Sequence, residues 1–264
     1  MEIIGYIAAI FIGISLGLIG GGGSILTVPL LVYLFGINPV TATSYSLFIV
    51  GLTSTVGSIH YFRMGLVNTK TAILFGIPSI ISVFITRAYI LPAIPLELIT
   101  IGSFVLTKDI FLMLVFALLM IGASYNMIKK VSINAIQNEE QKWANLMIAL
   151  KGTMVGTVTG LVGAGGGFLI IPALVLLRKL PMKEAVGTSL VIIAANSLIG
   201  FLGKSRDIIL DWNLLFMIAG FAIFGIFVGS FISKKIDGAK LKPAFGWFVL
   251  IMGIYIILKE TLLK

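Results

Sequence analysis

The stretch that decides the fold is GLIGGGGSILTVPLL, at residues 17–31. It returns as GLVGAGGGFLIIPAL at residues 160–174, and at this offset of 143 the two windows are identical at eight of fifteen positions. The same offset pairs Ser46 with Ser189 and Gly57 with Gly200 without a gap. The chain is therefore a duplicated unit, and a repeat of this length shapes the whole fold.

Each glycine cluster predicts a break between two helices. Glycine costs about 1 kcal/mol relative to alanine inside a helix, and it readily adopts backbone conformations that other residues avoid. Because apolar residues resume at once, a second short helix is expected after each break, kinked by Pro29 in the first half and by Pro172 in the second. Two glycine-interrupted apolar segments at matching positions indicate a binding site in a transporter built from repeats.

Composition indicates an integral membrane protein made of helices. Of the 264 residues, 59% are hydrophobic and 11% are charged, and the mean hydropathy is +1.14. Several apolar runs reach about 20 residues, the length of a helix that crosses a bilayer. The net charge of +9 is expected to reflect Lys and Arg in cytoplasmic loops, so no nucleic acid partner is expected. The absence of cysteine excludes disulfides and thiolate chemistry.

The hydrophobic pattern predicts an all-α polytopic bundle with three parts. These are a first transmembrane repeat at 1–128, a cytoplasmic connector at 129–143 and a second transmembrane repeat at 144–264. The expected helical segments are 3–19, 24–35, 40–61, 71–92, 109–128, 144–162, 167–178, 184–203, 212–233 and 242–258. A stretch at 93–108 is expected at the interface, with no counterpart in the second half.

The distribution of Lys and Arg favours one topology over another. If each glycine break is a hairpin that returns to the side it came from, twelve basic residues share one side and six the other, with Lys151 inside a segment. If each broken segment crosses once, the division is nine against nine. The first reading fits the positive-inside rule. It predicts both termini outside the cytoplasm and two repeats of inverted topology, an arrangement shared by many secondary transporters.

The doubled motif Gly-x-x-Gly-x-Gly-Gly, followed by Pro, and the segment AVGTSL at 185–190 resemble the TauE/SafE family of membrane transporters. The resemblance covers essentially the whole chain. It implies transport of anions across the plasma membrane, notably sulfite, sulfoacetate and other sulfonates, usually as export. The first repeat has TSYSL at 43–47 where the second has VGTSL at 186–190, so the two halves are not expected to use their sites equally.

The glycine breaks suit an anion because the free N–H groups and the positive dipole at a helix start bind negative charge. In the inverted arrangement both helix starts are expected to meet near the midplane. The alternative role is close packing of helices, which is favoured for Gly152, Gly156 and Gly160. The candidate donors are Gly22, Gly23 and Ser24 in the first half and Gly165, Gly166 and Gly167 in the second.

Polar side chains on the helix after each break are further candidates for binding the substrate. They are Ser44 and Ser46 in the first half and Thr188, Ser189, Asn196 and Ser197 in the second. Their hydroxyl and amide donors could complete the shell of an oxyanion. Hydrogen bonds between helices or to a preceding carbonyl are the alternative role of such side chains.

Three basic residues could supply electrostatic attraction or coupling. Arg87 and Lys151 lie in apolar runs, where a charge is expensive and suggests function, although long basic side chains also reach the interface by snorkelling. His60 is the only histidine, and an imidazole can carry a proton in coupled transport. An interfacial histidine without such a role is the alternative.

Acidic residues fall at segment ends or in loops, which favours an anion over a cation as cargo. No nucleophile–base pair or cluster of metal ligands is apparent, so neither an enzyme, a metal site nor a cofactor is expected. The glycines lack the Gly-Lys-Ser/Thr that binds nucleotide phosphates. The sequence favours a secondary transporter of a small anion in the bilayer. A passive anion channel and a non-transport membrane module are the alternatives, and coupled protons and further copies of the chain remain open as partners.

Overall fold

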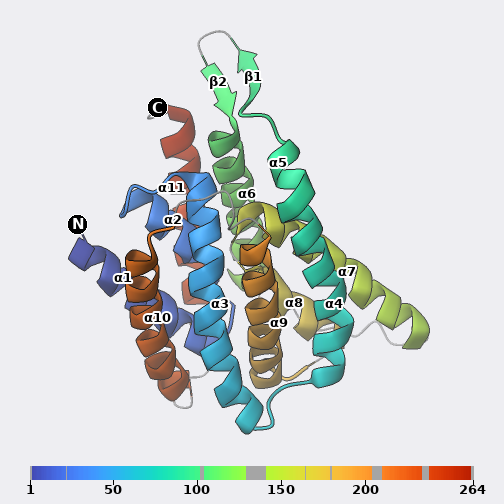
Figure 1. Cartoon of the computed structure of the whole chain (residues 1–264). Helices are drawn as coiled ribbons and strands as arrows, with labels where there is room; N and C mark the ends of the chain where they lie inside the picture. The colour runs from blue at the N-terminus through green and yellow to red at the C-terminus, as the bar shows by residue number, and fades with distance from the viewer. Residues whose placement is uncertain are drawn as a thin grey trace.

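The computed structural model describes residues 2–21, 23–101, 104–128, 141–163, 165–178, 180–203, 210–233 and 238–262. The described helices are α1 (Glu2–Ile19), α2 (Ser24–Tyr33), α3 (Pro39–Arg63), α4 (Thr69–Ile85), η1 (Thr86–Ile90), α5 (Leu91–Ala93), α6 (Lys108–Ile128), α7 (Gln141–Val162), α8 (Gly167–Arg178), α9 (Met182–Leu202), α10 (Trp212–Ser233) and α11 (Gly238–Leu262). Figure 1 shows them running side by side as a bundle. The predicted all-α architecture is confirmed.

Local sequence fixes where several helices begin. The side chain of Asn38 accepts a hydrogen bond from the Val40 N–H, and Pro39 stands at the first turn of α3, where a missing N–H costs nothing. The side chain of Asn68 caps α4 in the same way, by accepting from the Thr71 N–H at 3.0 Å. The predicted helical segments match the observed helices to within a few residues at each end.

The described part of the chain contains five helices that are long and apolar enough to cross a membrane, namely Pro39–Arg63, Thr69–Ala93, Lys108–Tyr125, Met182–Leu202 and Trp212–Ser233. The short helices that follow the breaks, α2 and α8, are not among them. Large apolar side chains such as Phe11 and Phe224 are exposed on the outside, as expected for a surface that faces lipid. The molecule is a polytopic helical membrane protein.

Helices from one half pack on helices from the other. The α1 helix lies against α10, and α7 lies against α4. A Cβ atom at Gly13 would lie 1.9 Å from the Ala222 carbonyl oxygen, and one at Gly156 would lie 2.3 Å from the Ser79 carbonyl oxygen. These two contacts are equivalent at the offset of 143, since 13 corresponds to 156 and 79 to 222. The predicted packing role of Gly156 is confirmed.

The central pair, α3 and α9, repeats the same relation (Figure 1). A Cβ atom at Gly57 would meet Leu190 at 3.4 Å, and one at Gly200 would meet Leu47 at 3.2 Å. These are again equivalent contacts at the offset of 143. Because the earlier residue of α3 contacts the later residue of α9, the two helices run antiparallel. Equivalent residues of the two halves therefore make reciprocal contacts.

One element differs from the predicted fold. The stretch expected at the interface, 93–108, contains a two-stranded antiparallel hairpin of β1 (Glu97–Ile101) and β2 (Phe104–Thr107). Its β-branched residues favour strands over a helix. The hairpin projects beyond one end of the bundle, the end at which α11 also finishes (Figure 1).

Candidate functional site

The glycine breaks have the predicted backbone geometry. Gly20 has φ +84° and Gly163 has φ +73°, and these left-handed values favour glycine. Each glycine ends its helix with the same hydrogen bond, from the Gly20 N–H to the Leu16 carbonyl and from the Gly163 N–H to the Thr159 carbonyl, both at 2.8 Å. The sequence therefore imposes the same helix end in both halves. Gly22, predicted as a donor, lies outside the described residues.

The two breaks touch each other. A Cβ atom at Gly21 would lie 2.2 Å from the Gly167 carbonyl carbon, and one at Gly167 would lie 2.5 Å from the Gly21 Cα. No residue with a side chain fits at either position without movement of the backbone. The two breaks therefore meet, at Gly21 before α2 and at Gly167, the first residue of α8.

Arg87 is the most unusual residue near the breaks. It lies on the π-helical turn η1 and is 0% exposed. Its guanidinium donates from Nη1 to Thr43 Oγ1 at 3.0 Å and from Nη2 to Ser44 Oγ at 2.5 Å. Its Nε is buried and has no partner. The side chain of Arg87 is therefore buried and does not snorkel to the membrane interface. The π-helical turn that carries it is a feature frequently found at functional sites.

Within the part of the chain that the structure describes, the Arg87 guanidinium has no opposite charge bound to it. Among the residues that the structure describes, its hydrogen-bond partners are hydroxyl groups and it makes no ion pair. Burial of an unpaired ion costs several kcal/mol, and hydrogen bonds to a charged group return about 1.5–3 kcal/mol each. The site therefore retains a positive potential that an anion would neutralise.

Arg87 adjoins the second break. A Cβ atom at Gly163 would lie 2.4 Å from Thr43 Cβ, and one at Gly160 would lie 2.7 Å from Thr86 Cβ. Thr43, which binds the guanidinium, thus packs against the end of α7. Thr86, which precedes Arg87, does the same. This junction of α3, η1 and α7 forms the candidate site, which we call the Arg87 junction.

Buried hydroxyls without partners lie beside the second break. Ser197 Oγ lies beside Gly165, 2.8 Å from where its Cβ would stand, and Thr159 Oγ1 lies beside Gly166. Such groups are normally hydrogen-bonded when buried, so they are available to a bound molecule. Among the described residues, buried hydroxyls without a partner are those of Ser15, Thr27, Ser46, Ser54, Thr86, Thr159 and Ser197.

Asn196 combines both roles considered for it. Its Nδ2 donates to Ser79 Oγ on α4 at 2.7 Å, which is a hydrogen bond between helices. Its Oδ1 is buried and has no partner. The side chain is therefore held in place by one end while the other end is free to accept.

Several predicted residues have local partners or lie elsewhere. Ser24 donates to the Gly21 carbonyl and Ser189 donates to the Val186 carbonyl, each at 2.8 Å. Thr188 accepts from the Asn68 N–H at 2.9 Å, at the start of α4. Lys151 is exposed on α7, and His60 is half-buried near the end of α3. The structure does not bring these two basic residues to the Arg87 junction.

Thr43, Thr86 and Thr159 are members of this region that sequence reasoning missed. A signal was present for Thr43, because the repeats differ there. At the offset of 143, Thr43 corresponds to Val186, Ser44 to Gly187 and Arg87 to Ser230. The guanidinium and both of its hydroxyl partners therefore change together between the halves.

Comparison with known proteins agrees with this architecture. The family model described as Sulfite exporter TauE/SafE matches residues 5–256. A probable membrane transporter protein of Xylella fastidiosa (strain 9a5c) is 30% identical over 255 residues, which cover 93% of this chain and 91% of that protein. The probable membrane transporter protein YunE of Bacillus subtilis (strain 168) is 28% identical over 91% of this chain and 89% of its own length. No solved structure matches the chain. The chain therefore belongs to the TauE/SafE family of membrane transporters.

Proposed function

We propose that the chain is a secondary transporter of a small anion, and that the anion is a sulfur oxyanion or an organosulfonate such as sulfite or sulfoacetate. It works in the plasma membrane in the direction of export. The anion binds around the two glycine breaks, and transport proceeds by alternating access. The name of the family, Sulfite exporter TauE/SafE, supports the substrate class and the direction.

The observation that carries this proposal is the buried guanidinium of Arg87, which among the described residues is bound by hydroxyl groups and not by a carboxylate. A guanidinium presents planar N–H donors that match the oxygens of an oxyanion, and the Nε of Arg87 has no partner. A bound monoanion neutralises the charge, while Ser197 and Thr159 supply hydroxyl groups at the adjoining break. A cation would be repelled from the same place.

The burial of Arg87 supports a carrier over an open channel. Its side chain is 0% exposed in this conformation, so an anion reaches it only after helices move apart. The antiparallel pairing of α3 and α9 supports repeats of inverted topology, in which one half rocks against the other around a central site. The proposed arrangement keeps the repeats at 1–128 and 144–264, with both termini outside the cytoplasm.

The direct test is anion binding to purified protein, measured as a rise in apparent melting temperature. A ligand that binds only the folded state stabilises it by an amount set by concentration over Kd. The panel contains sulfite, sulfate, thiosulfate, sulfoacetate, taurine, phosphate and simple carboxylates. We expect a selective shift with a sulfur anion, a loss of at least tenfold in affinity in Arg87→Met, and partial retention in Arg87→Lys. Arg63→Met, which removes an exposed arginine at the end of α3, is the matched control.

Transport assays then separate the carrier from its alternatives. In proteoliposomes loaded with the stabilising anion, a carrier shows saturable uptake that unlabelled anion inside accelerates. Non-saturable flux without this acceleration would identify a passive channel. Equal affinity in wild type and in a monodisperse Arg87→Met variant would remove the Arg87 junction from the substrate site.

A further inference from the structure

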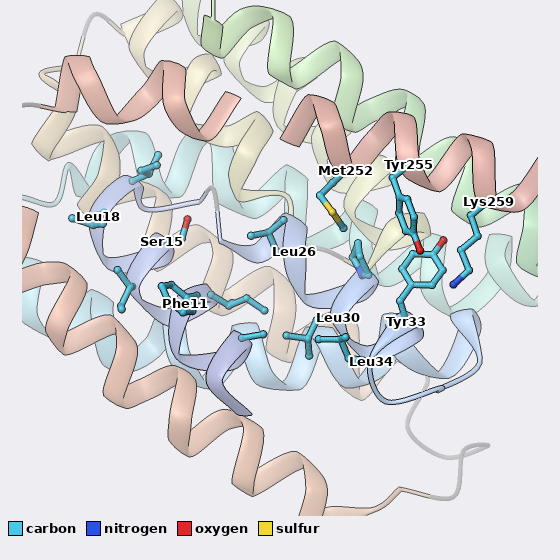
Figure 2. Close-up of a pocket in the computed structure, with 15 residues that line it drawn as sticks. Phe11, Ser15, Leu18, Leu26, Leu30, Tyr33, Leu34, Met252, Tyr255 and Lys259 are labelled. Carbon is cyan, nitrogen blue, oxygen red and sulfur yellow. The ribbon is translucent and has the colours of Figure 1, made fainter. Parts of the chain in front are cut away.

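A second site lies on the outside of the bundle, away from the Arg87 junction. A groove with a volume of about 710 Å³ runs between α1, α2 and α11. Ligand cavities of small molecules have volumes of about 300–1,000 Å³, so the groove is large enough for an ordered molecule. Figure 2 shows Leu18, Ser15 and Leu26 toward one end and Tyr33, Tyr255 and Lys259 at the other.

The chemistry of the groove changes along its length. Leu18, Ile19 and Leu26, which flank the first glycine break, make one end apolar. At the other end, Lys259 Nζ lies 4.0 Å from the centre of the Tyr33 ring and 5.9 Å from that of Tyr255. Lysine and tyrosine are typical of the level where lipid headgroups lie. The groove is thus apolar along its body and cationic at one end.

The ammonium of Lys259 is held on the groove side. Two tyrosine rings, whose centroids are 5.7 Å apart and which meet edge to face, support it. The neighbouring Glu260 is buried, accepts a hydrogen bond from the Tyr33 hydroxyl at 3.2 Å, and does not line the groove. Among the described residues that line the groove, the charged one is therefore Lys259.

We propose that this groove binds one phospholipid with an anionic headgroup, its phosphate at Lys259 and an acyl chain along Leu30, Leu26 and Leu18. A small hydrophilic anion would gain nothing from the apolar body of the groove. The apolar face of a helix from a second copy would match the apolar body of the groove but not the charge of Lys259. An anionic lipid matches both ends, and it lies against the first glycine break.

The site is tested with dioleoylphosphatidylglycerol added to delipidated protein, with the bound molecules counted by native mass spectrometry. Dioleoylglycerol, which has the same chains and no charged headgroup, is the matched probe. The variants are Lys259→Gln, which removes the cation, and Ser15→Phe, which fills the groove from a half-buried position on α1. Lys70→Gln, an exposed lysine at the start of α4, is the control.

We expect one tightly held phosphatidylglycerol on the wild type and on Lys70→Gln. Its affinity should fall at least fivefold in Lys259→Gln, while that of dioleoylglycerol stays unchanged. Ser15→Phe should weaken both probes. Unchanged phosphatidylglycerol affinity in either variant would overturn the proposal. So would a dimer that Ser15→Phe dissociates, because the occupant would then be a second copy of the chain.

Discussion

Arg87 has no charged counterpart in the second half, where the offset of 143 residues leads to Ser230. Its two hydroxyl partners, Thr43 and Ser44, likewise correspond to Val186 and Gly187. Gly20 and Gly163 share a left-handed backbone, whereas Gly23 has φ −67° and its equivalent Gly166 has φ +71°. The charge of Arg87 and its hydrogen bonds also occur in one half. The chemistry at the centre of this molecule is therefore less symmetric than its fold.

The residue scale gives a prediction for Thr43→Val, which introduces the residue that the second repeat has at this position. It removes one acceptor from the Arg87 guanidinium while it keeps the size of the side chain. We expect the affinity for the stabilising anion to fall about tenfold, equivalent to about 1.4 kcal/mol, because the guanidinium is held less firmly. Titration by thermal shift measures it.

Thr53→Val is the matched control for this change. Thr53 lies on the same helix, is also buried, and donates to the Ile49 carbonyl of its own helix at 2.7 Å. Its loss should leave anion affinity unchanged. If Thr43→Val and Thr53→Val bind the anion equally well, Thr43 has no part in the site.

Gly166→Ala tests the strain at the second break. Gly166 has φ +71°, and a Cβ atom there would lie 2.0 Å from Thr159 Oγ1. A side chain in the left-handed region costs about 1–3 kcal/mol, so we expect a clear fall in the melting temperature. Gly220→Ala is the control, because a Cβ atom at Gly220 in α10 meets nothing within 4 Å. It should be neutral or stabilising, since alanine favours a helix.

At the scale of the element, the hydrogen bond from Asn196 to Ser79 joins α9 to α4. We expect Asn196→Ala and Ser79→Ala to destabilise the protein by amounts that do not add. Hydrogen bonds between membrane helices contribute about 0.6 kcal/mol on average, and the coupling energy of the double-mutant cycle should be of that size. Equilibrium unfolding in detergent measures it.

A second cycle controls for effects that are not local. Ser79 combined with Thr261, an exposed residue at the end of α11, should give additive changes, because distant sites without shared partners do not couple. If the stability changes of the Asn196–Ser79 pair were also fully additive, their hydrogen bond would make no measurable contribution to stability.

The helices were predictable because glycine, proline and asparagine mark their ends. Gly20 and Gly163 end the helices before the breaks. Asn38 caps the start of α3, and Asn68 caps the start of α4. The hairpin of β1 and β2 was missed because its strands are short and apolar, like the segments around them. They therefore give no hydrophobic periodicity that differs from the rest of the chain.

The candidate site was predictable in part. The glycines indicated where the two halves meet, because only glycine permits both the left-handed backbone and the contact between Gly21 and Gly167. The bonds from Arg87 to Thr43 and Ser44 join residues more than forty positions apart. Hydropathy does not report such contacts, and the difference between the repeats was the one signal that pointed to them.

At the scale of the whole molecule, the proposed topology can be read from single cysteines, because the chain has none of its own. Leu96 is 80% exposed beside the hairpin, and Lys70 is exposed at the opposite end of the bundle, at the start of α4. In intact cells we expect a membrane-impermeant maleimide to label Leu96→Cys, and to label Lys70→Cys only after permeabilisation. The reverse pattern would place both termini in the cytoplasm.

The packing of α1 on α10 has a consequence for how the protein is made. Gly13 contacts Ala222, which the ribosome adds more than two hundred residues later. At about 5–20 residues per second, the first helix waits about ten to forty seconds in the bilayer before its partner emerges. During that interval its glycine-lined face is open to lipids and to any helper protein nearby. The last helices to enter the membrane thus decide when the first one reaches its final position.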